Sequence, residues 1–312
     1  MKTLNSIALV VVLLSLLSVC DAIADKPVFE IEAVSSYGTG DIAYEISASS
    51  LRNTVRSRLE FPLDGLYLGA NANYNIGAQF CGVQNLTFGF KFLTNVTDPD
   101  EDMNDFDWWN GKLVGDTESE AEASSYILDF SLQGDLVYRP DFVFSGIVGF
   151  RYESYEFDIY GVNGYYLPPI GDGSDVFLSL DNHVLAYEMT HSWFYGGIEG
   201  RVIITDSLVA EGSGVIGVGF VDDQDDHILR EKISTSEYIS ISSKLTGYLI
   251  WYLVPPDASM RFYLKAGGEI YTMYGEGEQD QHFEDGRDSF SGIDSEIEMT
   301  FISVNAMFGC SL

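Results

Sequence analysis

Apolar and polar residues alternate with a period of two over long segments of this chain, and this pattern restricts its fold more than any other feature. In residues 126–138, for example, Leu128, Phe130 and Leu132 share one face, and Asp129 and Ser131 share the other. A period of two is that of a β-strand, whose successive side chains point to opposite faces. Similar segments are predicted at 54–76, 124–139, 142–157, 184–205, 208–222, 236–254 and 260–275. Most of them exceed the ordinary strand of about 5–6 residues.

The connections between these segments alternate in length. The short ones are Gly77–Val83, Arg139–Asp141, Thr205–Ser207 and Val254–Ser259, and the long ones are residues 37–53, 96–123, 158–183, 223–236 and 276–292. Short periplasmic turns and long external loops are typical of outer-membrane barrels. We therefore predict an all-β fold, a ten-stranded antiparallel transmembrane β-barrel with both termini periplasmic and the long loops extracellular. A soluble β-sandwich, which would also alternate, is the alternative.

Charged residues also fall on the predicted inner face of the barrel. They are Arg56, Arg58, Glu60, Lys91, Asp129, Arg151, Glu153, Arg201, Lys244, Lys265 and Glu269. The interior of a small barrel is polar and filled by side chains. We expect these residues to neutralise one another and to leave no open pore.

The N-terminus has the pattern of a secretory signal peptide. Lys2 provides a positive charge, an apolar run extends from Ile7 to Val19, and Ala22–Ala24 offers a cleavage site. The run is too short to span a bilayer as a helix, which takes about 20 residues. We predict a signal peptide at residues 1–24 and a single barrel domain at residues 25–312. A lipoprotein signal with a lipobox at Leu17–Cys20 is the alternative.

The charge balance restricts the partners. The net charge is -32 with a pI near 4.1, which repels nucleic-acid phosphates and suits cationic partners. Most of the carboxylates lie in the predicted long loops. We predict no nucleic-acid partner, contact with outer-membrane lipid, and basic peptides or proteins as ligands. The sequence carries no information on the oligomeric state.

Two cysteines remain after the predicted cleavage. Cys81 lies in the first short turn and Cys310 at the end of the last strand, so both fall at the periplasmic end of the ten-stranded plan. The first and last strands of a closed barrel are neighbours, and neighbouring strands are about 4.8 Å apart. We therefore predict a disulfide between Cys81 and Cys310, with two unpaired thiols as the alternative.

Two short motifs in the long loops could carry chemistry. They are Asp105-Phe106-Asp107-Trp108 and Asp223-Gln224-Asp225-Asp226-His227. In extended backbone residues i and i+2 point the same way. Asp225 could then orient His227 and raise its basicity, so that the pair removes a proton from water. Asp105 and Asp107 could share a proton on the facing wall. Such a combination suits water-mediated peptide hydrolysis, whereas an isolated Asp-x-Asp in an acidic loop is usually a solvated surface.

On these motifs the chain resembles the omptins, the outer-membrane proteases of Gram-negative bacteria. Omptins are ten-stranded barrels with an Asp-x-Asp-Trp motif in the second external loop and an Asp-x-Asp-x-His motif in the fourth. The resemblance covers most of residues 28–309. It implies a hydrolase of the cell surface, an aspartic-type endopeptidase that cleaves at basic residues.

The resemblance also implies roles for individual residues. Asp225 and His227 would activate the water, and Asp105 and Asp107 would position it and stabilise the transition state. Asp223 and Glu45 match positions that bind a basic side chain before the scissile bond. Asp116 or Glu118 would serve the pocket after it.

Two departures from the omptin pattern keep alternatives open. Omptins bind lipopolysaccharide through basic clusters, and this chain has 16 lysine and arginine residues in all. Outer-membrane barrels commonly end in an aromatic residue, whereas here Phe308 is followed by four more residues. We predict no cofactor, with lipopolysaccharide dependence as an open alternative. A non-catalytic surface barrel, an adhesin or a structural outer-membrane protein, is the alternative function.

Calcium binding is the remaining alternative. Asp98, Asp100, Asp102 and Asp105 cluster in the second long loop, and hard oxygen ligands suit Ca²⁺. The spacing matches no EF-hand, and no glycine stands where such a loop would turn. We therefore predict no metal site.

Overall fold

The computed structural model describes residues 29–49, 53–77, 82–168, 176–254, 260–283 and 289–312. Its strands are β1 (Phe29–Ser49), β2 (Thr54–Pro62), β3 (Gly65–Asn75), β4 (Gln84–Asn95), β5 (Met103–Trp109), β6 (Lys112–Arg139), β7 (Phe142–Tyr166), β8 (Val176–Thr205), β9 (Leu208–His227), β10 (Lys232–Tyr252), β11 (Arg261–Phe283) and β12 (Phe290–Ser311). A single 3₁₀ turn, η1 (Ile228–Arg230), separates β9 from β10 in the described part of the chain.

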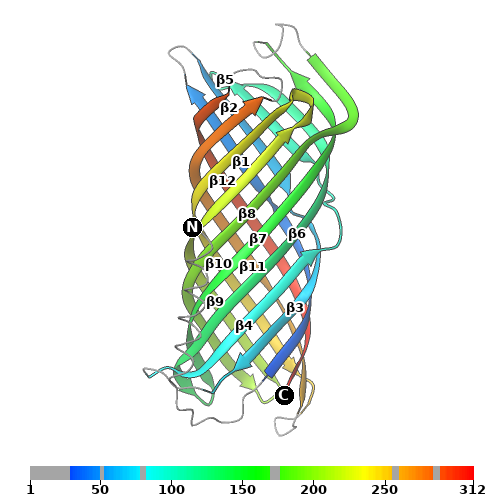
Figure 1. The fold of residues 1–312 in the computed structure, drawn as a ribbon. Coiled ribbons are helices and arrows are strands. Elements are labelled where there is room, and N and C mark those ends of the chain that lie inside the picture. The colour runs from blue at the N-terminus through cyan, green and yellow to red at the C-terminus, as the bar shows by residue number, and fades with distance from the viewer. Residues whose placement is uncertain (1–28, 50–52, 78–81, 169–175, 255–259, 284–288) are drawn as a thin grey trace.

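The strands form one closed antiparallel sheet, a tall barrel of tilted strands (Figure 1). β12 closes the ring by pairing with β1 along nearly its whole length. β1 pairs with β3 in its first half and with β2 in its second, so β2 and β3 together occupy one position in the wall. β4 and β5 share the next position in the same way. The ring therefore has ten positions, and the predicted ten-stranded antiparallel barrel is confirmed.

The predicted loop boundaries were wrong. Most of the predicted long loops continue the barrel wall: β9 extends to His227, β10 begins at Lys232, and β6 begins at Lys112. The predicted strand 54–76, in contrast, is interrupted between Pro62 and Gly65. The carboxylates of these segments lie on strands instead. Some, such as Asp116 and Glu118, point outward, and others, such as Asp223 and Asp225, line the inner wall. The motif residues thus lie on hydrogen-bonded strands.

The outer face of the barrel carries an apolar belt over the part of the wall nearer the short turns. Phe220 is 60% exposed, Ile239 70% and Val304 71%, and they belong to a larger set of exposed apolar side chains on all sides. Such side chains are what a lipid-facing barrel wall presents. On β9 the belt ends at Phe220, and the outward residues beyond it are Asp222 and Gln224. The wall beyond the belt projects past the lipid-facing surface, and we call it the outer end.

Ion pairs fill the middle of the barrel. Arg151 contacts Glu153 and, at 2.9 Å, Glu269. Asp129 is 2.6 Å from Lys244. Lys91, Arg201 and Lys265 are paired inside as well. The predicted neutralisation is therefore confirmed for these residues.

Three of the predicted interior charges were placed on the wrong face. Arg58 is the register partner of Glu45, and the neighbouring pair Tyr44 and Leu59 points inward. Arg56, Arg58 and Glu60 consequently lie on the outer face, where Arg58 Nε contacts Glu60 at 2.7 Å. Apolar residues fill the interior at this height, so the polar-inside rule fails in the outer half of the wall.

A layer of aromatic and apolar side chains separates the ion pairs from the outer end. Tyr44, Phe61 and Tyr187 stack there, with the rings of Phe61 and Tyr187 4.2 Å apart. Trp193, Met189, Ile297 and Met299 are buried in the same cluster. This apolar layer closes the barrel below the outer end and gives the strands there a rigid support.

Several predictions fall on residues outside those described. They include the signal peptide at residues 1–24, Cys20 and Cys81. Cys310 lies near the end of β12, opposite Ile31 of β1 and Phe262 of β11. The Cys81–Cys310 disulfide stays a prediction. Among the described residues no helix has the length and hydropathy of a membrane span.

Candidate active site

Asp225 and His227 lie side by side on the inner face at the end of β9. Asp225 is 1% exposed, and its Oδ2 atom is 2.9 Å from Nε2 of His227. Because the carboxylate of Asp225 contacts Nε2, the other ring nitrogen of His227, Nδ1, is the one that can accept a proton, as far as the described residues show. The other carboxylate oxygen of Asp225, Oδ1, is buried without a hydrogen-bond partner in the described part of the chain. The predicted dyad is thus present in the structure.

A tyrosine from β1 completes the dyad. The hydroxyl of Tyr44 donates a short hydrogen bond to Oδ2 of Asp225, the oxygen that also faces His227. Tyr44 is itself 2% exposed and stacks on Tyr187, with ring centroids 5.5 Å apart. The carboxylate of Asp225 is therefore held from two sides and cannot rotate freely.

Asp105 and Asp107 lie on β5, which is separated from β9 along the wall by β6, β7 and β8. Both point inward, because they alternate with Phe106 and Trp108, which face outward. On the outer face, Arg56 lies 3.8 Å over the ring of Trp108. Oδ2 of Asp105 accepts a hydrogen bond of 3.3 Å from the Tyr166 hydroxyl, and Oδ1 is buried without a partner among the described residues. The structure thus brings both predicted pairs to the inner wall of the outer end.

The electrostatics of these groups assign them different protonation states. Burial lowers the pKa of His227 below its ordinary value despite the opposing charge of Asp225, so the imidazole is neutral at neutral pH. Burial would raise the pKa of Asp225, but the charge and hydrogen bond of His227 outweigh it, and the pKa falls. Burial and the charge of Asp107 raise the pKa of Asp105 to about 7, and the charge of Asp225 adds to the rise. A proton is therefore available on the Asp105 side near neutrality.

Asp223 lies deeper, against the aromatic layer. It is 7% exposed, and its Oδ2 atom accepts hydrogen bonds from the hydroxyls of Tyr187, at 3.2 Å, and Tyr238, at 3.1 Å. Burial raises its pKa to about 7 against the effect of these hydrogen bonds, and the charge of Asp225 contributes to the rise. Asp223 is therefore a carboxyl group whose charge depends on the pH around neutrality.

We expect Asp223→Asn to stabilise the protein at pH 8. A folded pKa of about 7 against an ordinary 3.8 means that the contribution of Asp223 to stability is largest below pH 4 and is lost as the pH rises through 7. At about 1.4 kcal/mol per pKa unit the ionised carboxylate costs up to about 4 kcal/mol. The asparagine still accepts the tyrosine hydrogen bonds. Urea unfolding of the detergent-refolded variants should show a gain of about 2–4 kcal/mol at pH 8 and none at pH 4.

The control for this prediction is Asp222→Asn, on the exposed outer face of the same strand. It should change the unfolding free energy little at either pH. A loss of stability in Asp223→Asn at pH 8 would show that the ionised carboxylate is favourable in the fold, contrary to the argument above.

Glu45 does not lie with the other predicted site residues. It alternates with the inward Tyr44 and so lies on the outer face, where its carboxylate is 3.6 Å from Arg56 and 4.0 Å from Arg58. Asp116 and Glu118 alternate with the buried Thr117 and also point outward. The structure gathers Asp105, Asp107, Asp223, Asp225 and His227, and leaves these three outside the group.

Four residues of the site were missed by sequence reasoning: Tyr44, Tyr166, Arg230 and Lys232. Tyr44 and Tyr166 come from strands far from either motif, and no local pattern marks them. Arg230 and Lys232 lie three and five residues after His227 in the sequence. Their positive charges in an otherwise acidic segment were the signal that the sequence offered. In the structure the charges of Asp105, Asp107 and Asp225 act on both residues.

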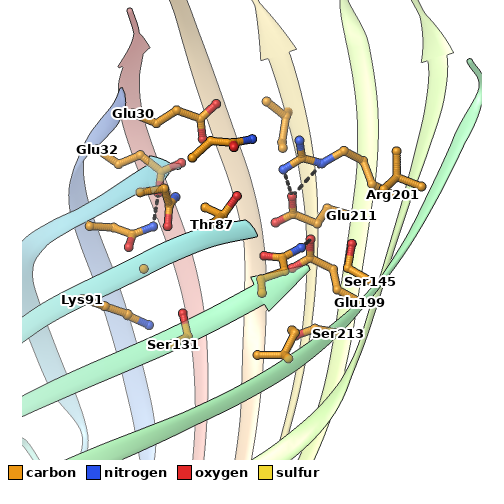
Figure 2. Close-up of a pocket in the computed structure, with 18 of the residues that line it drawn as sticks. Glu30, Glu32, Thr87, Lys91, Ser131, Ser145, Glu199, Arg201, Glu211 and Ser213 are labelled. Atoms are coloured by element: carbon orange, nitrogen blue, oxygen red, sulfur yellow. Dashed lines mark hydrogen bonds and ion pairs between the residues drawn. The ribbon is translucent and has the colours of Figure 1, made fainter. Parts of the chain in front are cut away.

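A cavity inside the barrel lies at the other end, toward the short turns. It measures about 410 Å³ and is lined by polar side chains, including Glu30, Glu32 and Arg201 (Figure 2). Arg201 donates two hydrogen bonds to Glu211, which also contacts Lys265. The ion pairs and the aromatic layer separate this cavity from Asp225 and His227, so it is not part of the candidate site.

The acidic segment considered for calcium is tied to the backbone. An Asp98 oxygen accepts from the backbone N–H of Ala123 at 3.2 Å, and the N–H of Asp100 donates to Asp64 at 2.7 Å. In the ranges that the structure covers, no group of three or more His, Cys, Asp or Glu side chains is arranged to hold a metal ion.

The fold and the site together define a class of protein, a ten-stranded barrel of the outer-membrane type with a carboxylate–imidazole dyad facing two carboxylates at its outer end. The crystal structure of the outer membrane protease OmpT from Escherichia coli is similar to it, with a TM-score of 0.73 over 90% of this chain and 96% of that chain, at 15% sequence identity. At this identity the similarity establishes a shared fold. The resemblance to the omptins is thus confirmed at the level of the fold.

Two further solved structures are similar to the chain only at low TM-scores. The toluene transporter TodX of Pseudomonas putida matches with a TM-score of 0.31 at 9% identity, over 92% of this chain and 89% of that one. The OmpT of Vibrio cholerae reaches 0.18 at 11% identity, over 92% and 98%. Neither protein family models nor curated protein sequences match the chain.

Proposed function

We propose that this chain is an endopeptidase of the outer membrane that cleaves peptides at basic residues with a water molecule activated by Asp225 and His227. The observation that carries the proposal is the contact of 2.9 Å between Oδ2 of the buried Asp225 and Nε2 of His227, on the wall opposite Asp105 and Asp107. OmpT of Escherichia coli, which shares the fold, is an outer membrane protease. The apolar belt supports a location in a membrane, with the site beyond the lipid. Phe29 and Leu312, which are hydrogen-bonded to each other, lie at the end of the short turns, and we propose that this end faces the periplasm.

The proposed reaction follows from the protonation states. Neutral His227 accepts a proton from water through Nδ1 while Asp225, fixed by Tyr44, stabilises the imidazolium that forms. Asp105 and Asp107 hold the water on its other side, and the proton on Asp105 can be donated as charge develops. When the C–N bond breaks, the imidazolium returns its proton to the leaving amine.

The proposed preference for basic residues depends on charge. Asp105, Asp107, Asp223 and Asp225 outnumber the cations Arg230 and Lys232 on the inner wall of the outer end, and such an excess of carboxyl groups favours cationic peptides. A bound guanidinium or ammonium group beside Asp223 would also lower its pKa and ionise it. Glu45 is not part of this proposal, because it lies on the outer face in contact with arginines.

The test is cleavage by purified, detergent-refolded protein of matched fluorogenic peptides that carry Arg-Arg, Ala-Ala or Glu-Glu at the centre, with and without lipopolysaccharide. The proposal expects cleavage of the Arg-Arg peptide and little or none of the Glu-Glu peptide. Lack of cleavage of all three under both conditions, by protein with the heat-modifiable mobility of a folded barrel, would favour the alternative of a non-catalytic surface barrel.

A further inference from the structure

Lys232 is the first residue of β10, the strand that pairs with β9, and its side chain faces the interior of the barrel. In the register of β9 and β10 it is the Cα partner of His227, and it is 8% exposed. Burial and the charge of Arg230 lower the pKa of Lys232, and the charges of Asp225, Asp105 and Asp107 oppose this shift, so the carboxylates of both walls are within electrostatic reach of its ammonium group. No role is given to it by either motif of the sequence.

The other inward lysines of the barrel show what a structural lysine does here. Lys244 Nζ is 2.6 Å from Asp129, Lys265 Nζ is 2.8 Å from Glu211, and Lys91 Nζ is 3.2 Å from Glu269. Lys232 differs, because no described carboxylate comes within 4.0 Å of its Nζ atom. An ammonium group that is withdrawn from bulk water without a close counter-ion costs free energy unless a further group compensates it.

The carboxylates around Lys232 also have free capacity. Oδ1 of Asp225 and Oδ1 of Asp105 are buried and lack a hydrogen-bond partner in the described part of the chain, and so does the hydroxyl of Ser234, the register partner of Asp225. Buried polar atoms without partners are rare in folded proteins, and each needs an explanation such as a catalytic role or a bound water or ion. Among the described residues, acceptors without partners and an ammonium group without a close carboxylate thus face the same interior.

We infer that Lys232 is a further catalytic residue, whose ammonium group stabilises the oxyanion that forms when water adds to the scissile carbonyl. The inference rests on the proposed function and extends it to the electrophilic side of the reaction. Positive charge placed where negative charge develops is commonly the largest single contribution to such reactions. Asp105, Asp107 and Asp225 repel an oxyanion when they are ionised, so a cation has to offset them. Of the two cations of the site, Arg230 and Lys232, it is Lys232 that the strand register pairs with His227.

The step balances as follows. His227 Nδ1 takes a proton from water, the water oxygen bonds to the carbonyl carbon, and the π electrons move to the carbonyl oxygen. The Lys232 ammonium donates a hydrogen bond to that oxygen and keeps its protons. The intermediate then re-forms the carbonyl, the C–N bond breaks, and the amine leaves with the proton held by His227.

Steady-state kinetics on the Arg-Arg peptide test this role with Lys232→Met, Lys232→Arg and Lys112→Met. Lys112 is an exposed lysine at the same end of the barrel and serves as the matched control. We expect Lys232→Met to lower kcat by about 100-fold or more with KM changed by less than about threefold, as for the loss of one oxyanion donor. Lys232→Arg should recover at least about tenfold of that loss, because it keeps the charge. The control should match the wild type.

Chemical rescue separates catalysis from a structural role. In Lys232→Ala, added ethylammonium should restore turnover by about tenfold or more without changing the unfolding temperature, since the free cation replaces the missing one during the reaction. The rescue of Lys232→Ala also tests the role of Lys232 if the Lys232→Met variant does not fold. Wild-type cleavage with unchanged kcat in Lys232→Met, or no rescue in Lys232→Ala, overturns the role of Lys232 alone. Absence of cleavage by the wild type overturns the proposed function and this inference together.

Discussion

His227→Ala is expected to lower kcat for cleavage of an Arg-Arg peptide by about 10²–10⁴-fold, the range for loss of a positioned general base. The imidazole is the only group of the dyad that is neutral and basic near neutral pH, because burial keeps its pKa low while Asp225 stays ionised. The substrate still meets the carboxylates of both walls, so KM should change far less than kcat.

His282→Ala is the matched control for this loss. His282 lies on the exposed outer face of β11 and contacts Ser289 at 3.0 Å, away from the site. Its removal should leave the rate unchanged. Equal activity of His227→Ala and the wild type would remove the dyad from the mechanism, whatever the source of the activity.

Arg151→Met is expected to lower the free energy of unfolding by about 3–5 kcal/mol, the cost of breaking a buried ion pair. Arg151 is 1% exposed and contacts two buried carboxylates, Glu153 and Glu269. It also lies 4.8 Å over the ring of Tyr271. Removing the guanidinium leaves Glu153 without its cation in an interior that excludes water, which is the cause of the loss. Urea titration of the refolded protein in detergent measures it.

The double variant Arg151→Met/Glu153→Gln tests the cause. Because the second substitution removes the uncompensated charge, it should recover part of the stability lost in the single variant. A loss under about 1 kcal/mol in the single variant would mean that water or other groups compensate the carboxylates, and that the pairs are not what stabilises the middle of the barrel.

Much of the fold followed from local pattern. The alternation around residues 126–138 and the short turns at Pro140 and Asp206 were enough to predict ten antiparallel wall positions, because strand length and turn length are local properties. The boundary between strand and loop was less accessible. In β9 and β10 the inward residues Asp223, Asp225, Ser234 and Ser236 are polar, so this part of the wall shows no apolar alternation and resembles a solvated loop.

The side of the wall on which a charge lies was also hard to predict. Arg56 and Arg58 alternate with Ser57 and Leu59 much as the interior charges alternate elsewhere, but beyond the lipid the rule reverses. There the outer face meets water and the inner face meets the aromatic layer of Phe61, Phe157 and Tyr187. The same reversal accounts for Glu45, which shares the outer face with these arginines.

The paired motifs predicted the core of the candidate site, and tertiary packing supplied the rest. Asp225 and His227 meet because i and i+2 share a strand face, which a sequence shows. Tyr44 reaches Asp225 from a strand that lies near it only in the closed barrel, and Tyr166 reaches Asp105 in the same way. Such contacts between distant strands leave no local mark in the sequence.

Mass spectrometry of the Arg-Arg peptide after incubation with wild-type protein and with Asp225→Asn in ¹⁸O-water tests the central claim most directly. The account predicts one cut at the basic site, with one ¹⁸O atom in the new carboxyl group, by the wild type, and a product yield lower by about 100-fold or more for Asp225→Asn. No product from correctly folded wild-type protein, or equal yields from the two proteins, would contradict a water-activating dyad at Asp225 and His227.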